Sequence, residues 1–150
     1  MSNSKKFEDL IEVLNLLLSP NGCDWDRKQT HKSLIPYLVE ETYEVIESIE
    51  NNDMDGLKEE LGDLMLHVVF QAKLADNDRH FNIYDVLGDI SSKLIRRHPQ
   101  VFSEKTDQNQ GLSSWEKAKK IEKKRTSVLD GVPKSLAALT KARRIQEKAS

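Results

Sequence analysis

Two short acidic segments of this 150-residue chain carry carboxylates at helical spacing. Glu41 and Glu44 stand three residues apart, so they share one face if their segment is helical. Glu60 and Asp63 repeat the same spacing further along the chain. Carboxylate oxygens are hard ligands that bind Mg²⁺, Mn²⁺ or Ca²⁺ in preference to Zn²⁺. The first chemistry that the sequence indicates is therefore the binding of a hard divalent cation.

The two acidic pairs meet if their helices form an antiparallel hairpin about Asn52. In that register Glu41 lies opposite Asp63. Glu44 then lies opposite Glu60, and both pairs stand roughly 14 Å from the turn. Like charges held this close raise one another's pKa, and a divalent cation would neutralise them. A solvent-exposed acidic face is the simpler alternative, but the matched heights favour a metal site formed by all four carboxylates.

Cationic residues gather near the expected end of a later helix, in the segment 93–98. Lys93 and Arg97 are four residues apart and share a face, with Arg96 beside them. Like charges at this spacing repel, and a bound phosphate would relieve the repulsion through bidentate contacts to arginine. A cationic last turn also complements the helix dipole, which explains the segment equally well. Beside a divalent-cation site, the segment favours a phosphorylated substrate.

Trp25 stands between Asp24 and Asp26, in a segment that we expect to be a loop. Its ring either stacks on a nucleobase or packs against the helices and holds the loop, and packing is the commoner outcome. His67 follows Asp63 by four residues, so it either reaches the metal or packs in the core, and packing is again favoured. The chain contains no phosphate-binding loop, dinucleotide fingerprint or HExxH pattern.

The elements that must position these residues are helices, because apolar residues recur at helical spacing along most of the chain. The predicted helices cover about residues 6–18, a segment from a cap at Thr30 or Ser33 to about Glu50, about 55–75, a segment from a cap at Asn82 to about His98, and a last segment after Pro133. The side chains predicted to be buried are Leu10, Val13, Leu14, Leu17, Leu38, Val45, Ile46, Ile49, Leu57, Leu61, Leu64, Val68, Ala72, Val86, Leu87, Ile90, Leu94, Leu136, Leu139, Ala142 and Ile145.

The region after the fourth predicted helix has a different character. Residues 103–114 are expected to form a mobile loop, and a strongly basic helical segment follows from Trp115 to Arg125. No Gly or Pro stops the last predicted helix before Ser150, so we expect it to continue into a second domain or to fray.

The composition narrows the class of protein. The chain has 23 Lys and Arg against 25 Asp and Glu, and this net charge of −2 argues against a general nucleic-acid-binding protein. No apolar run approaches the roughly 18 residues of a membrane helix, so no membrane partner is expected. The N-terminus lacks a signal-peptide core, and the single Cys23 cannot form an internal disulfide, which fits the cytoplasm. We predict one all-α domain over residues 1–150, a helical bundle built around the acidic hairpin.

Several separated motifs resemble those of the MazG family of nucleoside triphosphate pyrophosphohydrolases. They are Cys23-Asp24-Trp25-Asp26, Gln29-Thr30-His31, Glu40-Glu41-Thr42-Tyr43-Glu44, Glu59-Glu60-Leu61-Gly62-Asp63, Lys93 to Pro99, Trp115-Glu116 and Val132 to Leu136. The resemblance runs from about residue 7 to the C-terminus. In one departure, Asp24 occupies a position where the family commonly has proline.

The resemblance implies an all-α enzyme that uses Mg²⁺ to cleave nucleoside triphosphates to monophosphate and pyrophosphate, with Mn²⁺ as a possible substitute. It implies metal ligation by Glu41, Glu44, Glu60 and Asp63, the four residues that the hairpin selects. It also implies contacts from Lys93 and Arg97 to the phosphates, and it implies dimers or dimers of dimers. Arg96, beside them, is a further candidate for substrate binding. A single domain of this kind is similar to the N-terminal domain of two-domain members.

The hypothesis that follows is metal-assisted hydrolysis at the α-phosphorus. A spare carboxylate accepts the proton of the attacking water, with Glu40 the first candidate and Glu47 the second. Glu40 and Glu41 are the predicted catalytic residues, and Trp25 joins the basic residues in substrate binding. Two alternatives stay open: a regulatory domain that binds nucleotide without hydrolysing it, and a structural helical module. The sequence leaves open the preferred nucleobase and sugar, the number of metal ions and the general base.

Overall fold

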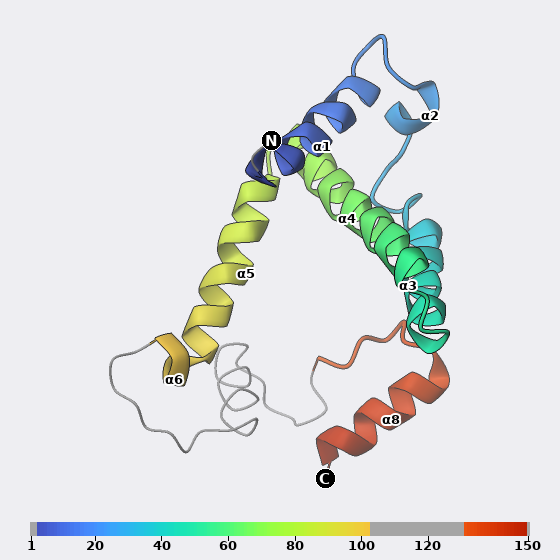
Figure 1. Ribbon diagram of the computed structural model, residues 1–150, viewed down its shortest axis with the longest axis vertical. Coiled ribbons are helices and arrows are strands. Elements are labelled where there is room, and N and C mark those ends of the chain that lie inside the picture. The colour runs from blue at the N-terminus through green and yellow to red at the C-terminus, as the bar shows by residue number, and fades with distance from the viewer. Residues whose placement is uncertain (1–2, 103–130, 150) are drawn as a thin grey trace. The chain divides into compact units, whose positions relative to one another are not determined.

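The computed structural model describes residues 3–102 and 131–149. Within these ranges the chain forms helices and no β-strand, which confirms the all-α prediction (Figure 1). The helices are α1 (Asn3–Leu17), α2 (Asp24–Arg27), α3 (Ile35–Glu50), α4 (Met54–Asn77), α5 (Ile83–Arg97), α6 (Pro99–Phe102) and α8 (Ala138–Ala149). They belong to two compact units, Met1–Asp89 and Ile90–Ser150, and α5 runs across the boundary. The single domain over residues 1–150 stays a prediction.

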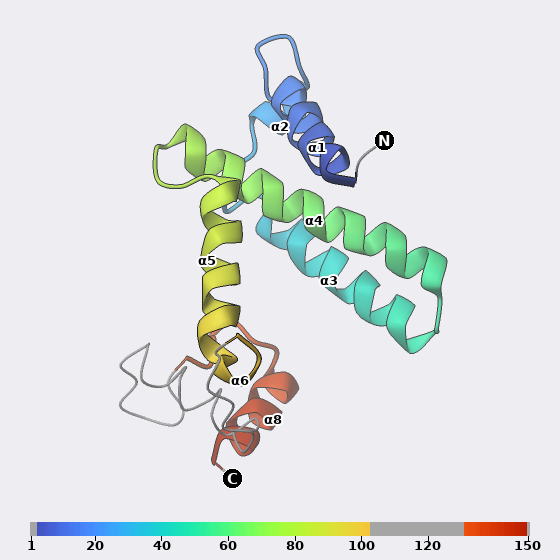
Figure 2. The same cartoon turned by 60° about the vertical axis from the view of Figure 1, so that its left-hand side comes forward.

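Helices α3 and α4 form the predicted antiparallel hairpin, and Figure 2 shows them side by side. Pro36 lies in the first turn of α3, where its missing N–H is not needed for a helical hydrogen bond. The turn between the helices closes when Asn52 adopts a left-handed backbone conformation with φ of 56°. The side chain of Asp53 then caps α4 by accepting a hydrogen bond from the Gly56 amide at 3.0 Å. This turn sets the register that aligns the acidic pairs.

A small core forms where α1 packs against the C-terminal half of α4. Its buried apolar side chains are Leu14, Leu34, Val69, Phe70, Ala72 and Ile83. The predicted burial of Leu14 and Ala72 is confirmed. Because this core lies toward the end of α4 remote from the hairpin turn, it anchors the hairpin and leaves the acidic segments outside it.

Several side chains predicted to be buried are exposed in the single chain. They are Val13, Leu17, Ile46, Ile49, Leu61, Val68, Leu87, Ile90, Leu94 and Leu139. The prediction of burial is wrong for these residues within one chain. Helical periodicity identifies an apolar face, but it does not identify what covers that face.

The cap predicted for α5 is present in the structure, whereas the cap predicted for α3 is not. The side chain of Asn82 accepts hydrogen bonds from the amides of Tyr84 and Asp85 at 2.8 and 3.2 Å, which confirms the cap of α5. The predicted cap of α3 is wrong: its N-cap is Leu34, without a side-chain cap. The hydroxyl groups of Thr30 and Ser33 instead accept hydrogen bonds from each other's backbone amides, in the turn before α3.

The segment around Trp25 and the segment after residue 102 were both predicted from the sequence. The four-residue helix α2 occupies a segment that was expected to be a loop. Its first turn carries Asp24 and Asp26, which favour a helix N-terminus. The expected loop over residues 103–114 and the basic helix from Trp115 to Arg125 lie outside the described residues. In the part of the chain that is described, no helix is long and apolar enough to cross a membrane.

Candidate metal and substrate site

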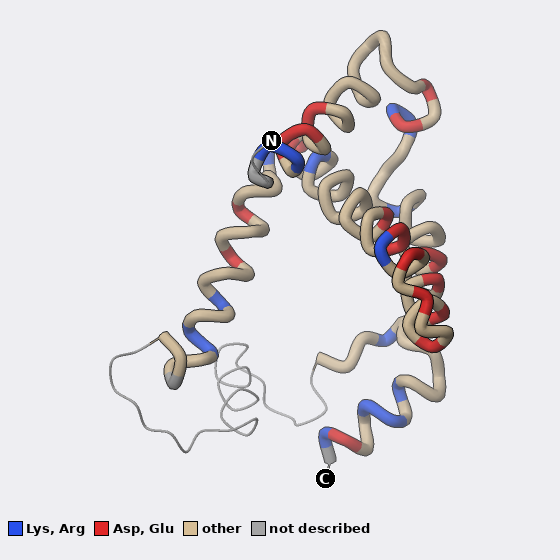
Figure 3. Tube along the Cα trace, in the orientation of Figure 1, with Lys and Arg blue, Asp and Glu red and all other residues tan. Residues whose placement is uncertain are grey.

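Three carboxylates come together on the hairpin. Glu41 of α3 and the Glu60 and Asp63 side chains of α4 each offer an oxygen, and these atoms all lie within 4.8 Å of one another. Figure 3 shows acidic residues gathered along the hairpin. The turn at Asn52 produces this arrangement, because it sets the register of two helices that each present acids at helical spacing. Three carboxylate oxygens at this spacing suit a hard divalent cation.

Glu44 lies beside this group, although it is not among the three. Its side chain hydrogen bonds to that of Glu41, and its charge also raises the pKa of Glu60. The structure therefore brings the four predicted metal ligands into one neighbourhood, with three of them close enough to share an ion.

The electrostatics of the cluster oppose full ionisation. Burial raises the pKa of Glu41 to about 7, and the hydrogen bond to Glu44 and the charges of Asp63, Glu44 and Glu60 add to the rise. The pKa of Glu60 is raised in the same way, first by burial and then by neighbouring acids. A bound cation would remove this repulsion, so the donor set and its charge fit a hard divalent cation.

The two candidate general bases lie on α3 beside the cluster. Glu40 precedes Glu41 directly, and Glu47 follows Glu44 by three residues. Both side chains are exposed, and neither belongs to the group within 4.8 Å. Their predicted catalytic role therefore stays a prediction.

His67 lies on α4, one turn after Asp63. It is only 8% exposed, which agrees with the expectation that it packs in the core. Its Nδ1 has no hydrogen-bond partner within the described ranges. Burial lowers the pKa of His67, while the charge of Asp63 acts in the opposite direction. His67 is therefore a neutral, incompletely satisfied group next to the cluster.

Trp25 lies in α2 and is half exposed, so packing accounts for only part of its surface. Its ring meets that of Tyr37 edge to face, with centroids 5.7 Å apart and an interplanar angle of 78°. Sequence reasoning did not single out Tyr37. The signal that could have found it was its position four residues before Glu41, which puts both side chains on one face of α3.

The predicted phosphate-binding residues lie on the last two turns of α5. Lys93, Arg96 and Arg97 all belong to the second unit, whereas the carboxylates belong to the first. Arg97 is buried and Arg96 is exposed. Contact of these residues with a substrate held at the carboxylates stays a prediction.

The fold and the site define a class of protein: an all-α chain in which a helical hairpin gathers carboxylates. Residues 29–102 match the MazG nucleotide pyrophosphohydrolase domain. A solved structure of a mazG-related protein from Thermotoga maritima matches with a TM-score of 0.61 at 30% identity, covering 79% of this chain and 99% of that chain. The chain therefore belongs to the MazG family, which confirms the resemblance seen in its motifs.

Longer relatives match over nearly the whole chain. The nucleoside triphosphate pyrophosphohydrolase/pyrophosphatase MazG of Thermotoga maritima is 48% identical over 146 residues, which are 96% of this chain and 56% of that protein. The nucleoside triphosphate pyrophosphohydrolase of Escherichia coli strain K12 is 41% identical over 149 residues, covering 95% of this chain and 57% of that protein. The chain thus spans little more than half the length of these two relatives, whose names describe the longer proteins.

Proposed function

We propose that this chain hydrolyses nucleoside triphosphates to nucleoside monophosphate and pyrophosphate with Mg²⁺. The observation that carries the proposal is the group of Glu41, Glu60 and Asp63, whose ligand atoms lie within 4.8 Å. The names of the longer relatives support the choice of substrate. Such an activity would control the nucleotide pool, and the single cysteine suits the cytoplasm.

In this mechanism the carboxylates of Glu41, Glu60 and Asp63 would hold the ion, with Glu44 as the fourth ligand. Mg²⁺ would neutralise the phosphates and lower the pKa of a water, and Mn²⁺ would substitute for it. Glu40, or Glu47 in its place, accepts a proton from the attacking water. The catalytic pair is therefore Glu40 and Glu41.

The proposal also gives a role to three cations of α5. Lys93 and Arg97, with Arg96 beside them, bind the phosphates and stabilise the negative charge that builds up on the leaving pyrophosphate. Trp25 contributes to holding the substrate.

The same proposal includes a homodimer or higher homo-oligomer. Apolar side chains along α3 and α4, among them Val39, Ile46, Leu61 and Met65, are exposed in the single chain. Burying them against a second copy would remove a large apolar surface from water. No contact with nucleic acid or with a membrane is part of the proposal.

The test is product analysis with each of the eight common ribonucleoside and deoxyribonucleoside triphosphates plus Mg²⁺. Equal amounts of monophosphate and pyrophosphate, lost on adding EDTA, are expected. Glu41→Gln and Asp63→Asn should each lower kcat by roughly 100-fold or more. Glu50→Gln, an exposed acid at the far end of α3, is the matched control and should retain activity.

Other products would contradict the proposal in different ways. Diphosphate and phosphate would mean cleavage of the other anhydride bond. Saturable nucleotide binding without any product would instead select the regulatory nucleotide-binding domain, and absence of both would select a structural module.

A further inference from the structure

An exposed aromatic pair lies one helical turn from the carboxylate cluster. Tyr37 precedes Glu41 by four residues in α3, so their side chains share a face about 6 Å apart along the helix axis. The ring of Trp25 meets the ring of Tyr37 at 5.7 Å. All three residues belong to the first compact unit, so the aromatic pair and the carboxylate cluster are parts of the same folded unit.

The pair keeps a large part of its surface open. Trp25 is 51% exposed and Tyr37 is 41% exposed. In an edge-to-face pair, the ring that contributes its edge keeps both faces clear of the other ring. The exposed part of the pair therefore offers aromatic surface to a planar ligand, one helical turn from Glu41.

The backbone that carries Trp25 is held in place by close packing at Gly22. A Cβ at Gly22 would stand 2.1 Å from the carbonyl oxygen of Leu17, so the chain folds back tightly on the end of α1. The amide of Cys23 donates to that same oxygen at 2.8 Å. The segment that leads into α2 is thus fixed against α1.

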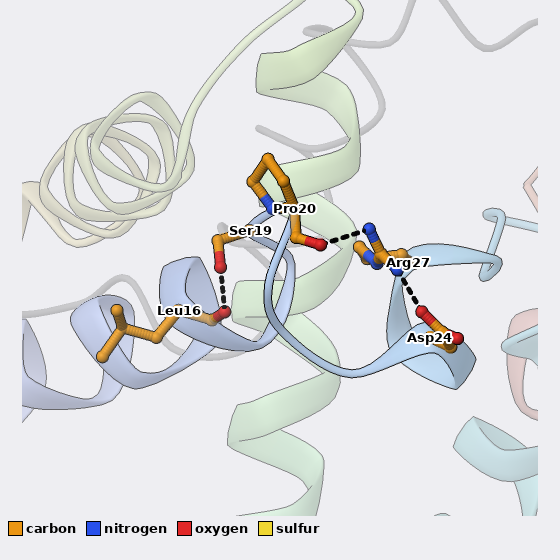
Figure 4. Close-up of polar contacts among 5 residues, drawn as sticks. All are labelled: Leu16, Ser19, Pro20, Asp24 and Arg27. Carbon is orange, nitrogen blue, oxygen red and sulfur yellow. Dashed lines mark hydrogen bonds and ion pairs between the residues drawn. The ribbon is translucent and has the colours of Figure 1, made fainter.

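Side-chain contacts brace the same loop from the other end, as Figure 4 shows. Arg27 donates to the carbonyl oxygen of Pro20 at 2.8 Å and also pairs with Asp24. Gln29 donates to the carbonyl oxygen of Trp25 at 2.9 Å. Asp24 stands where the MazG motif commonly has proline, and its ion pair with Arg27 helps to hold this loop. The loop presents Trp25 from a preorganised backbone, which reduces the entropy lost when a ligand stacks on it.

We infer that Trp25 and Tyr37 form a stacking platform for the nucleobase of the substrate. This inference rests on the proposed function and names its specificity: recognition through the face of the base rather than through hydrogen bonds to its edge. Stacking tolerates every base, because each has a π-face, and it grows with ring area. The platform therefore predicts broad use of nucleoside triphosphates, with purines bound more tightly than pyrimidines.

The test compares substrates and a ligand that lacks a base. KM and kcat are measured for ATP and CTP, and inorganic tripolyphosphate is titrated as a competitive inhibitor. Trp25→Ala should raise KM for ATP roughly 5- to 100-fold with little change in kcat. It should also make the KM values for ATP and CTP more alike. The inhibition constant of tripolyphosphate should stay unchanged. Trp25→Phe should restore most of the loss, and Tyr37→Ala should behave like Trp25→Ala.

Tyr84→Ala is the matched control, because Tyr84 is an exposed aromatic residue elsewhere in the same unit. This variant should leave the difference between the KM values for ATP and CTP unchanged. An equal loss of tripolyphosphate binding in Trp25→Ala would mean that the pair only supports the fold. A change in sedimentation of that variant would mean that the pair forms a contact between subunits. An unchanged KM for ATP would contradict the stacking platform.

A second measurement separates this inference from the proposed function. Trp115→Phe leaves Trp25 as the only tryptophan of the chain. Stacking of ATP should quench its fluorescence, whereas tripolyphosphate should not, whether or not the protein hydrolyses either ligand. Quenching without turnover would retain the platform and reject the hydrolase, and turnover without quenching would do the reverse.

Discussion

Glu41 of α3 and Asp63 of α4 bring carboxylate oxygens to within 4.8 Å of each other across the hairpin. Two acids at this distance repel if both are ionised, and Glu60 lies in the same group. The fold holds them there because the turn at Asn52 and the packing of α1 on α4 fix the hairpin. Folding without a cation therefore works against this repulsion.

The stability of the metal-free protein should depend on the protonation of Glu41. Its pKa rises from 4.5 to about 7 on folding, so the folded state binds the proton more tightly. The stability that this group contributes is fully present below pH 4.5 and is lost as the pH rises through 7. In EDTA, Tm should fall by several degrees over that window relative to Glu41→Gln, measured by circular dichroism.

Mg²⁺ provides the control for the prediction on Glu41. At pH 7.5 it should raise the Tm of the wild type and of Glu50→Gln, and it should raise that of Glu41→Gln much less. Identical pH profiles for wild type and Glu41→Gln would show that the acids of the cluster do not interact.

His67 should give a pH dependence of the opposite sign. Burial lowers its pKa below the usual 6.5, so its contribution to stability is present above pH 6.5 and is lost as the pH falls through the lowered pKa. His67→Phe removes both the titration and an unpaired buried nitrogen. We expect this variant to gain about 1 kcal/mol at pH 5.5, or roughly 2–4 °C in Tm, and less at pH 8. A larger gain at pH 8 than at pH 5.5 would contradict the assignment.

The hairpin was predictable because its register depends on local signals. Asn52 and Asp53 mark the turn, and the helical period then decides that Glu41 faces Asp63. Tyr37 was missed because the sequence does not show which side chain the ring of Trp25 meets. Its partner Trp25 lies in α2, whose four residues are too few to show a period.

Burial was the least predictable property. Leu14 and Leu61 both sit on apolar helical stripes, yet the first is buried and the second is exposed in the single chain. An apolar stripe in the sequence shows that one face of a helix is apolar, whereas burial of that face depends on which other element packs against it. For Leu14 that element is α4 of the same chain.

A charge at Leu61 should weaken the proposed oligomer. Leu61 is exposed in the first half of α4, and Leu61→Lys would place a solvated ammonium in an apolar contact. Analytical ultracentrifugation should show the wild type as a dimer or larger and this variant shifted toward monomer, with unchanged helicity. Lys58→Gln changes a side chain of the same helix that is 82% exposed, and it serves as the control. A monomeric wild type at micromolar concentration would contradict the proposal.

Two glycines of the first unit should respond in opposite ways to alanine. Gly22 has no room for a methyl group, because a Cβ would meet the carbonyl oxygens of Leu16 and Leu17 at 2.4 and 2.1 Å. Gly22→Ala should therefore displace the loop that carries Trp25, and it should cost about 1–3 kcal/mol. Gly62 lies inside α4, where a Cβ would meet nothing within 4 Å outside its own helix backbone and its chain neighbours.

Gly62→Ala should stabilise the chain by about 0.5–1 kcal/mol, because alanine loses less backbone entropy than glycine in a helix interior. Chemical denaturation of the two variants against wild type measures both effects. Fluorescence of Trp25 in the Trp115→Phe background should change for Gly22→Ala and not for Gly62→Ala. A destabilised Gly62→Ala would mean that another chain or a ligand approaches the backbone between Glu60 and Asp63 closely, so that only glycine fits there.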